Sequence, residues 1–69
     1  MELVIEGDYI TLAQFLKLTD VISSGGQAKF FLQEENVYVN GIVDKRRGRK
    51  LYPGDEIQYG EQVYVIRAE

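Results

Sequence analysis

A run of six residues holds five of the eight Lys and Arg side chains in this chain of 69 residues. The run is Lys45-Arg46-Arg47-Gly48-Arg49-Lys50, and with Asp44 it forms a segment of net charge +4 in a chain of net charge −3. Blocks of like charge repel one another and add nothing to a core, so the run is expected to face a polyanion, of which phosphate is the commonest in cells. The alternative is a solvated loop that happens to be basic.

The residue inventory excludes most catalytic and metal chemistry. The chain has no Cys and no His, which excludes thiolate and imidazole metal sites, Cys or Ser-His nucleophile systems and disulfides. Gly48-Arg49-Lys50 is not a nucleotide-binding P-loop, because Leu51 follows it and no Gly stands five places before Gly48. The sequence therefore predicts a protein that is not an enzyme, with no cofactor and no small-molecule substrate.

Length and composition predict a single domain over residues 1–69. A domain of this size buries only about 60% of the surface that its unfolded chain exposes, so its stability is marginal. With 45% hydrophobic and 28% charged residues, the chain still has enough apolar material for a core. Its apolar runs are short, and Met1 is followed directly by Glu2, which is not the pattern of a signal peptide. A cytoplasmic protein with no membrane partner is expected.

Two short helices are predicted from a start signal that occurs twice. Thr11-Leu12-Ala13-Gln14 and Ser24-Gly25-Gly26-Gln27 both fit a capping box, in which the hydroxyl and Gln side chains each cap a backbone amide. The first helix is expected over about residues 12–18, and the second begins near Gly25. Helices this short must pack on each other and on a sheet. The apolar face of the second helix consists of Ala28, Phe31 and Leu32.

The remaining segments alternate with a period of two, which predicts strands. Asn40-Gly41 is the strongest hairpin signal, because both central residues of a type I′ turn need positive φ. Pro53-Gly54 predicts a type II turn. The strands are expected within residues 2–6, 37–39, 42–43, 56–59 and 62–66. The order β, α, α and then several β predicts an α+β fold, with two short N-terminal helices packed on a small, mostly antiparallel sheet.

Three further groups of residues are candidates for contact with a polyanion. At Ser23-Ser24-Gly25-Gly26, the amides of a helix start can hold a phosphate, and the glycines allow a close backbone approach. A plain helix cap explains the same residues equally well. Lys29 and Lys17 are expected to be exposed cations, although two exposed lysines are ordinary. Asn40-Gly41 either presents the adjoining backbone beside the helix or is a hairpin turn and no more.

Aromatic side chains are the natural partners of unstacked bases. Most of the candidates are expected in the core. Phe30 is the exception, because it lies beside the apolar face of the second helix. Its role as a base platform, an interface residue, a partly buried flank or a core residue is open, with an interface or a partly buried flank favoured over stacking. The candidates are Phe30, Phe31, Tyr38, Tyr52, Tyr59 and Tyr64.

Four segments follow one another in an order and spacing that is specific as a set. They are Thr11 to Leu16, Ser24 to Leu32, Val37-Tyr38-Val39-Asn40-Gly41 and Pro53 to Ile57. This series resembles the S4 RNA-binding domain, also called the αL motif. Within that family the chain is most similar to the stand-alone YaaA/YbcJ-like subgroup of small bacterial proteins, for which Ser-Ser-Gly-Gly and a basic Arg-Arg-Gly-Arg-Lys-Leu run are typical.

The resemblance implies an S4-like fold and RNA binding by the start of the second helix together with the basic segment. One departure is Gly25, because the broader family usually has Arg after the helix Ser. Affinity is therefore expected to rest more heavily on residues 45–50. On matching positions, the resemblance implies RNA contacts from Ser24, Gln27, Lys29, Asn40, Gly41, Lys45, Arg46, Arg47, Arg49 and Lys50.

Together these observations predict a non-catalytic module that binds structured RNA such as rRNA or tRNA, with a role in ribosome assembly that rests on the resemblance alone. RNA is favoured over DNA because no helix carries several base-reading side chains along an exposed face. The alternative is a protein-interaction module, in which the basic run binds an acidic partner and Phe30 anchors a contact. The sequence leaves open whether the protein also binds a ribosomal protein or a second copy of itself. Replacing Arg46, Arg47 and Arg49 by Gln is expected to weaken RNA binding with little loss of fold.

Overall fold

Seven short strands, two α-helices and one 3₁₀ turn make up the computed structural model, which describes residues 1–69. The two helices stand between the second and third strands, so the order of elements agrees with the predicted α+β class. In chain order the elements are β1 (Glu2–Ile5), β2 (Ile10–Thr11), α1 (Leu12–Leu18), η1 (Gly25–Gln27), α2 (Ala28–Glu34), β3 (Val37–Val39), β4 (Ile42–Val43), β5 (Lys50–Leu51), β6 (Glu56–Tyr59) and β7 (Gln62–Ala68).

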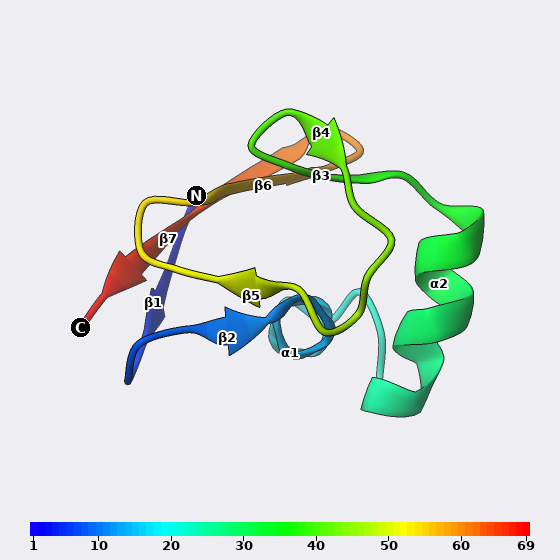
Figure 1. Cartoon of the computed structure of the whole chain (residues 1–69), viewed down its shortest axis with the longest axis horizontal. Helices are drawn as coiled ribbons and strands as arrows, with labels where there is room; N and C mark the ends of the chain where they lie inside the picture. Colours follow the sequence, from blue (N-terminus) through cyan, green and yellow to red (C-terminus); the bar gives the residue numbers. More distant parts are fainter.

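The main sheet has five strands in the order β1-β7-β6-β3-β4, and all neighbours are antiparallel except β1 and β7. The first strand of the chain thus lies parallel to the last, with Leu3 opposite Ile66. This pairing carries β7 on to Ala68, two residues beyond the predicted strand end. A separate antiparallel pair, β2 and β5, lies beside α1, and α2 stands at the other end of the molecule (Figure 1).

The predicted turn chemistry is present in the backbone. Asn40 and Gly41 have φ of 52° and 83°, as the hairpin between β3 and β4 requires. Gly54 has φ of 97°, and the Asp55 amide donates to the Tyr52 carbonyl at 3.0 Å, which closes the Pro53-Gly54 turn. These local signals set the strand register because each turn fixes which residues face one another.

Both helix starts carry the predicted capping glutamine. For α1, the Thr11 amide donates to Gln14 Oε1 at 2.7 Å, and the Gln14 amide donates to Thr11 Oγ1 at 3.2 Å. At the second start, Gln27 Oε1 accepts from the Ser23 amide at 2.7 Å and from the Ser24 amide at 3.3 Å. The second helix differs from the prediction in its first turn, which is the 3₁₀ turn η1 and not α-helix.

The core lies between the helices and the sheet, and Phe15 and Leu32 are among its fully buried side chains. Phe31 and Tyr59 pack against it with their rings 5.1 Å apart in an edge-to-face arrangement. Tyr52 was expected in the core but is 47% exposed, and Phe30 is 67% exposed, which excludes a core role for Phe30. The buried core consists of Ile5, Ile10, Leu12, Phe15, Leu16, Ile22, Ala28, Leu32, Val37, Val39, Leu51, Ile57 and Ile66. Neither helix is long and apolar enough to cross a bilayer.

Candidate nucleic-acid interface

Residues 44–50, which we call the basic loop, run from the end of β4 into the first residue of β5 and are docked on the start of α1. The Leu12 amide donates to the Arg49 carbonyl at 2.8 Å, and the Ala13 amide donates to the Arg47 carbonyl at 2.9 Å. The first amides of a helix have no hydrogen-bond acceptor within the helix. These two bonds therefore give acceptors to the first amides of α1 and donors to two carbonyls of the basic loop. The backbone of the basic loop is therefore fixed against α1.

A second anchor of the basic loop is Asp44, whose side chain is only 8% exposed. Asp44 Oδ1 accepts from Arg46 Nε at 3.1 Å and from the Arg46 amide at 2.9 Å, while Oδ2 accepts from Arg46 Nη2 and Arg49 Nη1, both at 2.8 Å. The Arg46 side chain, the Arg46 amide and Arg49 hold the pKa of Asp44 well below its usual range, against the opposing effect of burial. Asp44 also raises the pKa of Arg46.

A third anchor is Lys45, which caps the end of α2. Its Nζ donates to the Leu32 carbonyl at 2.9 Å and lies 3.4 Å from both the Glu35 carbonyl and Asn36 Oδ1. A cation at this place neutralises the negative end of the helix. Three of the five cations of the run thus have structural partners, which the charge pattern alone does not show.

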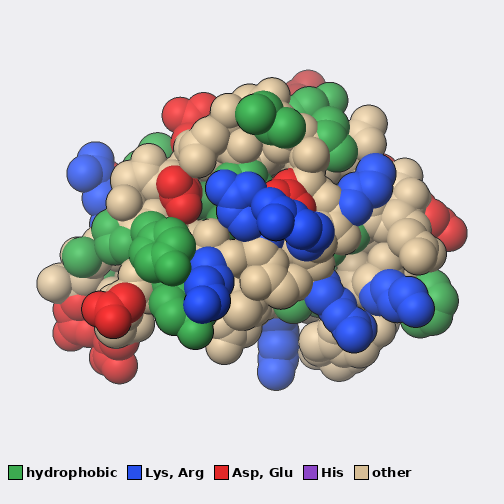
Figure 2. All heavy atoms as spheres, in the orientation of Figure 1, with side chains coloured by type: hydrophobic (Ala, Val, Ile, Leu, Met, Phe, Trp, Pro, Cys, Tyr) green, Lys and Arg blue, Asp and Glu red, His purple; other side chains and the backbone are tan.

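The remaining two cations, Arg47 and Lys50, are exposed and form no ion pair. Arg46 is paired yet 70% exposed, so much of its guanidinium also faces solvent. One hollow of about 480 Å³ is lined by Arg46, Gly48, Arg49, Lys50 and Tyr52. Figure 2 shows Lys and Arg side chains in a band across this face, over the basic loop and toward α2, with most acidic side chains at the margins.

Two exposed tyrosines lie beside these cations. The Tyr9 and Tyr52 rings are 5.7 Å apart, both are more than 40% exposed, and Lys50 Nζ lies 4.9 Å from the centre of the Tyr9 ring. Tyr9 was not a sequence candidate, and Tyr52 was assigned to the core. Pairing of β2 with β5 brings them together, since Ile10 stands opposite Leu51. One local pattern in the sequence could have indicated that these tyrosines are exposed. Each lies next to a buried strand residue, and successive side chains of a strand point to opposite faces.

The start of the second helix contributes exposed residues at a different place. Ser24, Gly25, Gly26 and Lys29 are all exposed, but no hydrogen bond joins them to the basic loop. Lys45 contacts the opposite end of α2, so the two predicted contact regions are separated along the helix. Lys17 lies on α1 beside a hollow that it shares with Leu18 and Asp20, apart from the basic loop.

Asn40 has a structural role that its hairpin position did not reveal. Its Nδ2 donates to Asp55 Oδ1 at 3.1 Å, and its Oδ1 accepts from the Glu56 amide at 2.9 Å. Asp55 Oδ2 in turn accepts from the Tyr52 amide at 2.8 Å. The Asn40 side chain therefore joins the β3-β4 hairpin to the turn that carries Tyr52.

The comparisons with known proteins agree with this architecture. A family model described as S4 domain matches residues 3–67. Over 54 residues the chain is 61% identical to the "Probable ribosome maturation protein RlbA" of Bacillus subtilis (strain 168), a match that covers 78% of this chain and 76% of that protein. Over 59 residues it is 34% identical to the "Putative RNA-binding protein YbcJ" of Escherichia coli (strain K12), with 84% of each chain covered. These matches confirm the resemblance seen in the sequence: the chain belongs to the S4 domain family.

Proposed function

We propose that this protein is a non-catalytic module that binds structured RNA, with the basic loop as its main contact surface. The observation that carries the proposal is the docking of this loop against α1, Asp44 and the end of α2, which holds its backbone and three of its five cations in place before any ligand arrives. Preorganised side chains lose less conformational entropy on binding than a flexible basic tail. Family membership and the names of the two relatives support RNA as the polyanion.

The bonds of Asp44 to Arg46 and Arg49, which we call the Asp44 clamp, leave both arginines able to bind phosphate. A guanidinium has five N–H donors, and Asp44 engages two of those on Arg46 and one on Arg49. The other donors can bind phosphate oxygens while the clamp fixes the plane of each group. Asp44, Arg46 and Arg49 together still carry a net charge of +1. The clamp thus lowers the positive charge of the basic loop but fixes the orientation of the two guanidinium groups.

The fold does not require glycine at three exposed positions, two at the start of the second helix and one in the basic loop. Gly25, Gly26 and Gly48 do not have positive φ, and an added Cβ would meet nothing closer than Ser24 Oγ, 3.9 Å from the Gly26 position. Neither backbone strain nor packing therefore explains the missing side chains. Close approach of an RNA backbone does explain them, and it supports contact at Ser24 and Gln27 as well as at the basic loop.

Tyr52 supplies a surface for one unpaired base beside the phosphate contacts. Its ring borders the hollow that Arg46 and Lys50 also line. Aromatic stacking on bases is a common mode for unpaired nucleotides in folded RNA. This arrangement favours a structured RNA with a paired segment next to an unpaired residue, a description that rRNA and tRNA both fit. A role in ribosome assembly agrees with the name of the Bacillus relative.

The decisive test removes the two cations of the basic loop whose side chains form no ion pair or hydrogen bond within the protein. We expect Arg47→Gln with Lys50→Gln to weaken RNA binding by about tenfold, equivalent to about 1.4 kcal/mol, without a change in melting temperature. If the wild type contacts about four phosphates, log K against log salt has a slope near −3, from about −0.7 per phosphate, and the double variant flattens it by about 1.4. The measurement is fluorescence anisotropy with rRNA fragments identified by crosslinking in cells.

Arg67→Gln is the matched control for this pair. Arg67 is exposed, pairs with Glu2 at 2.7 Å and lies on β7, three strands from the edge strand β4 that leads into the basic loop. Arg67→Gln should leave both the RNA affinity and the slope of log K against log salt at wild-type values. A salt-insensitive wild type, or equal losses in control and double variant, would refute the electrostatic interface. Stoichiometric co-purification of an acidic protein with only background RNA would favour the protein-interaction alternative.

A second test addresses the glycines at the start of the second helix. Gly26→Ala is expected to stabilise the protein by about 0.4 to 1 kcal/mol, because Ala restricts the unfolded chain and meets no close neighbour. RNA affinity is expected to fall severalfold, because the methyl group occupies space that the RNA backbone enters. Melting curves and anisotropy titrations of one sample separate the two effects. Higher stability with unchanged affinity would show that this helix start is a cap alone.

A further inference from the structure

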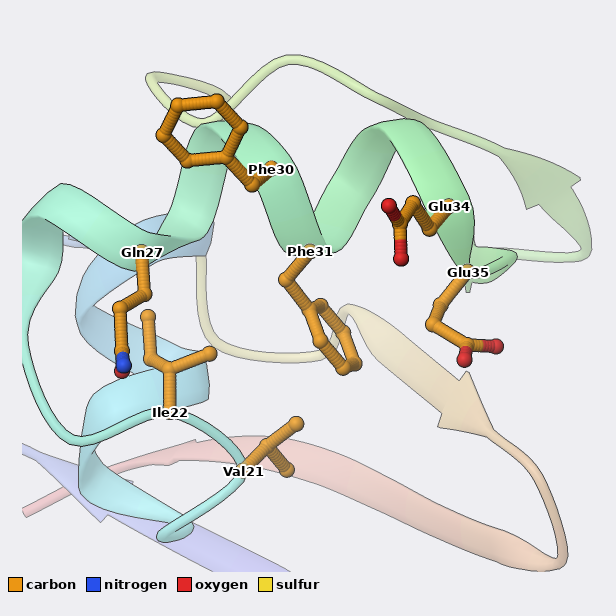
Figure 3. Close-up of a pocket in the computed structure, with 7 residues that line it drawn as sticks. All are labelled: Val21, Ile22, Gln27, Phe30, Phe31, Glu34 and Glu35. Atoms are coloured by element: carbon orange, nitrogen blue, oxygen red, sulfur yellow. The ribbon is translucent and has the colours of Figure 1, made fainter.

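The side of α2 that carries Phe31 borders a hollow whose chemical character is opposite to that of the basic loop. We call it the α2 hollow; its volume is about 320 Å³. Figure 3 shows Val21 and Ile22, from the segment after α1, directed toward Phe31 across the gap, with Phe30 on the outer side of the helix and the two glutamates near its end. The lining residues are Val21, Ile22, Gln27, Phe30, Phe31, Glu34 and Glu35.

The apolar part of the α2 hollow is more exposed than folding requires. Phe30 is 67% exposed, and Val21 and Phe31 are half-buried at the margin of the core. Aromatic side chains that stand exposed at the edge of a hollow are typical anchors of protein interfaces. The space between Phe31 and Val21 is large enough for one large apolar side chain to enter.

The charged part of the α2 hollow consists of two carboxylates without partners. Glu34 and Glu35 are exposed, and the three ion pairs of the protein involve other acids, Asp44 and Glu2. Lys45 lies nearby but donates to the Glu35 carbonyl and not to either carboxylate. Lys45 neutralises the helix end itself, so the negative charge here is that of the two carboxylates. A phosphate backbone would be repelled here, whereas a Lys or Arg side chain would gain a partner.

We propose that the α2 hollow docks a basic peptide segment of a partner protein, with one large apolar side chain in the hollow and a neighbouring Lys or Arg on Glu34 and Glu35. The charge pattern selects this occupant over RNA and over an acidic peptide. Proteins that share an RNA target are rich in such basic segments, because they also bind phosphate. This proposal does not depend on the RNA contacts of the basic loop.

The test uses random twelve-residue peptides displayed on phage and selected on the whole protein. We expect the enriched peptides to share a Phe, Leu or Ile with a Lys or Arg close by in sequence, and to bind as synthetic peptides in the micromolar range that a small interface supports. Phe30→Ser, and separately Glu34→Gln with Glu35→Gln, should each weaken that binding by about tenfold, as for loss of a central anchor. Added salt should weaken binding to the wild type and have less effect on the double Gln variant.

Matched controls are available elsewhere on the chain. Leu18→Ser removes another exposed apolar side chain, and Glu6→Gln with Glu61→Gln removes two other exposed acids; neither should alter peptide binding. Acidic consensus peptides, or equal binding to Phe30→Ser, would overturn the proposal. So would a wild-type dimer in sedimentation that Phe30→Ser dissociates, which would make a second copy the occupant. A loss of RNA affinity in Phe30→Ser at unchanged sedimentation would make Phe30 a base platform instead.

Discussion

Asp44→Asn is expected to lower the free energy of unfolding by about 1.5 to 3 kcal/mol at neutral pH, the range for hydrogen bonds to charged groups. The substitution keeps the shape of the side chain but removes the charge that holds Arg46 and Arg49. It also leaves an amide N–H₂ facing a guanidinium, where neither group accepts a hydrogen bond. Urea unfolding at pH 7 measures the loss. An unchanged midpoint would mean that the clamp forms without stabilising the fold.

The pH dependence of this loss follows from the direction of the pKa shift. The pKa of Asp44 is lower in the folded protein than the value near 3.9 of an unfolded chain, because the Arg46 and Arg49 bonds favour the carboxylate. The stabilisation is therefore fully present above about pH 5 and is lost as the pH falls through the unfolded value and below it. We expect the gap in stability between wild type and Asp44→Asn to be constant from pH 5 to 8 and to shrink below pH 4.

Replacing Arg46 and Arg49 together by Gln is expected to cost about 2 to 3 kcal/mol of stability, because the buried Asp44 carboxylate loses its charged donors. This prediction differs from the one drawn from the sequence, in which Gln at Arg46, Arg47 and Arg49 causes little loss of fold, because the ion pairs with Asp44 are now known. Adding Asp44→Asn to the pair should restore at least half of the loss, since no buried charge then remains. Denaturant melts of the single, paired and triple variants measure this coupling.

The matched comparison for the arginine pair is Arg47→Gln with Lys50→Gln, which removes the same charge from the same loop without touching Asp44. That variant should have the same melting temperature as the wild type. If both pairs melt alike, Asp44 is solvated well enough to dispense with its partners, and the clamp is not a stabilising element. If the arginine pair is destabilised and the triple variant is not rescued, the loss lies in the loop and not in the buried carboxylate.

The parts of the fold that sequence reasoning predicted are those specified by neighbours in the chain. Asn40-Gly41 needs positive φ at both positions, and Thr11 and Gln14 cap one another within a single turn, so each signal is complete within four residues. The helix bounds at residues 12–18 followed for the same reason. An observed strand end differs from the predicted one where a strand pairs with a distant segment. Thus β7 extends to Ala68, beyond the predicted end at residue 66, because β1 pairs with it.

The candidate site was predictable in composition but not in the role of each residue. The charge pattern singled out residues 45–50, yet Lys45, Arg46 and Arg49 form bonds that depend on Asp44 and on the end of α2. Asp44 lies only two and five residues from Arg46 and Arg49, but the charge pattern does not show that its side chain is buried against them. The Lys45 contacts form only after α2 has packed beside the loop, so no local pattern records them. The Tyr9 and Tyr52 pair is hidden for the same reason, since pairing of β2 with β5 joins residues 43 positions apart.

The parallel pairing of β1 with β7 also bears on how the chain folds during synthesis. Leu3 is synthesised before the helices and the other strands, but its partner Ile66 follows only after all of them have been made. Contacts between such distant positions slow folding, because a long loop must close before they form. The nascent chain therefore carries β1 unpaired until β7 emerges, and the helices and the β3-β4 hairpin have the first opportunity to form.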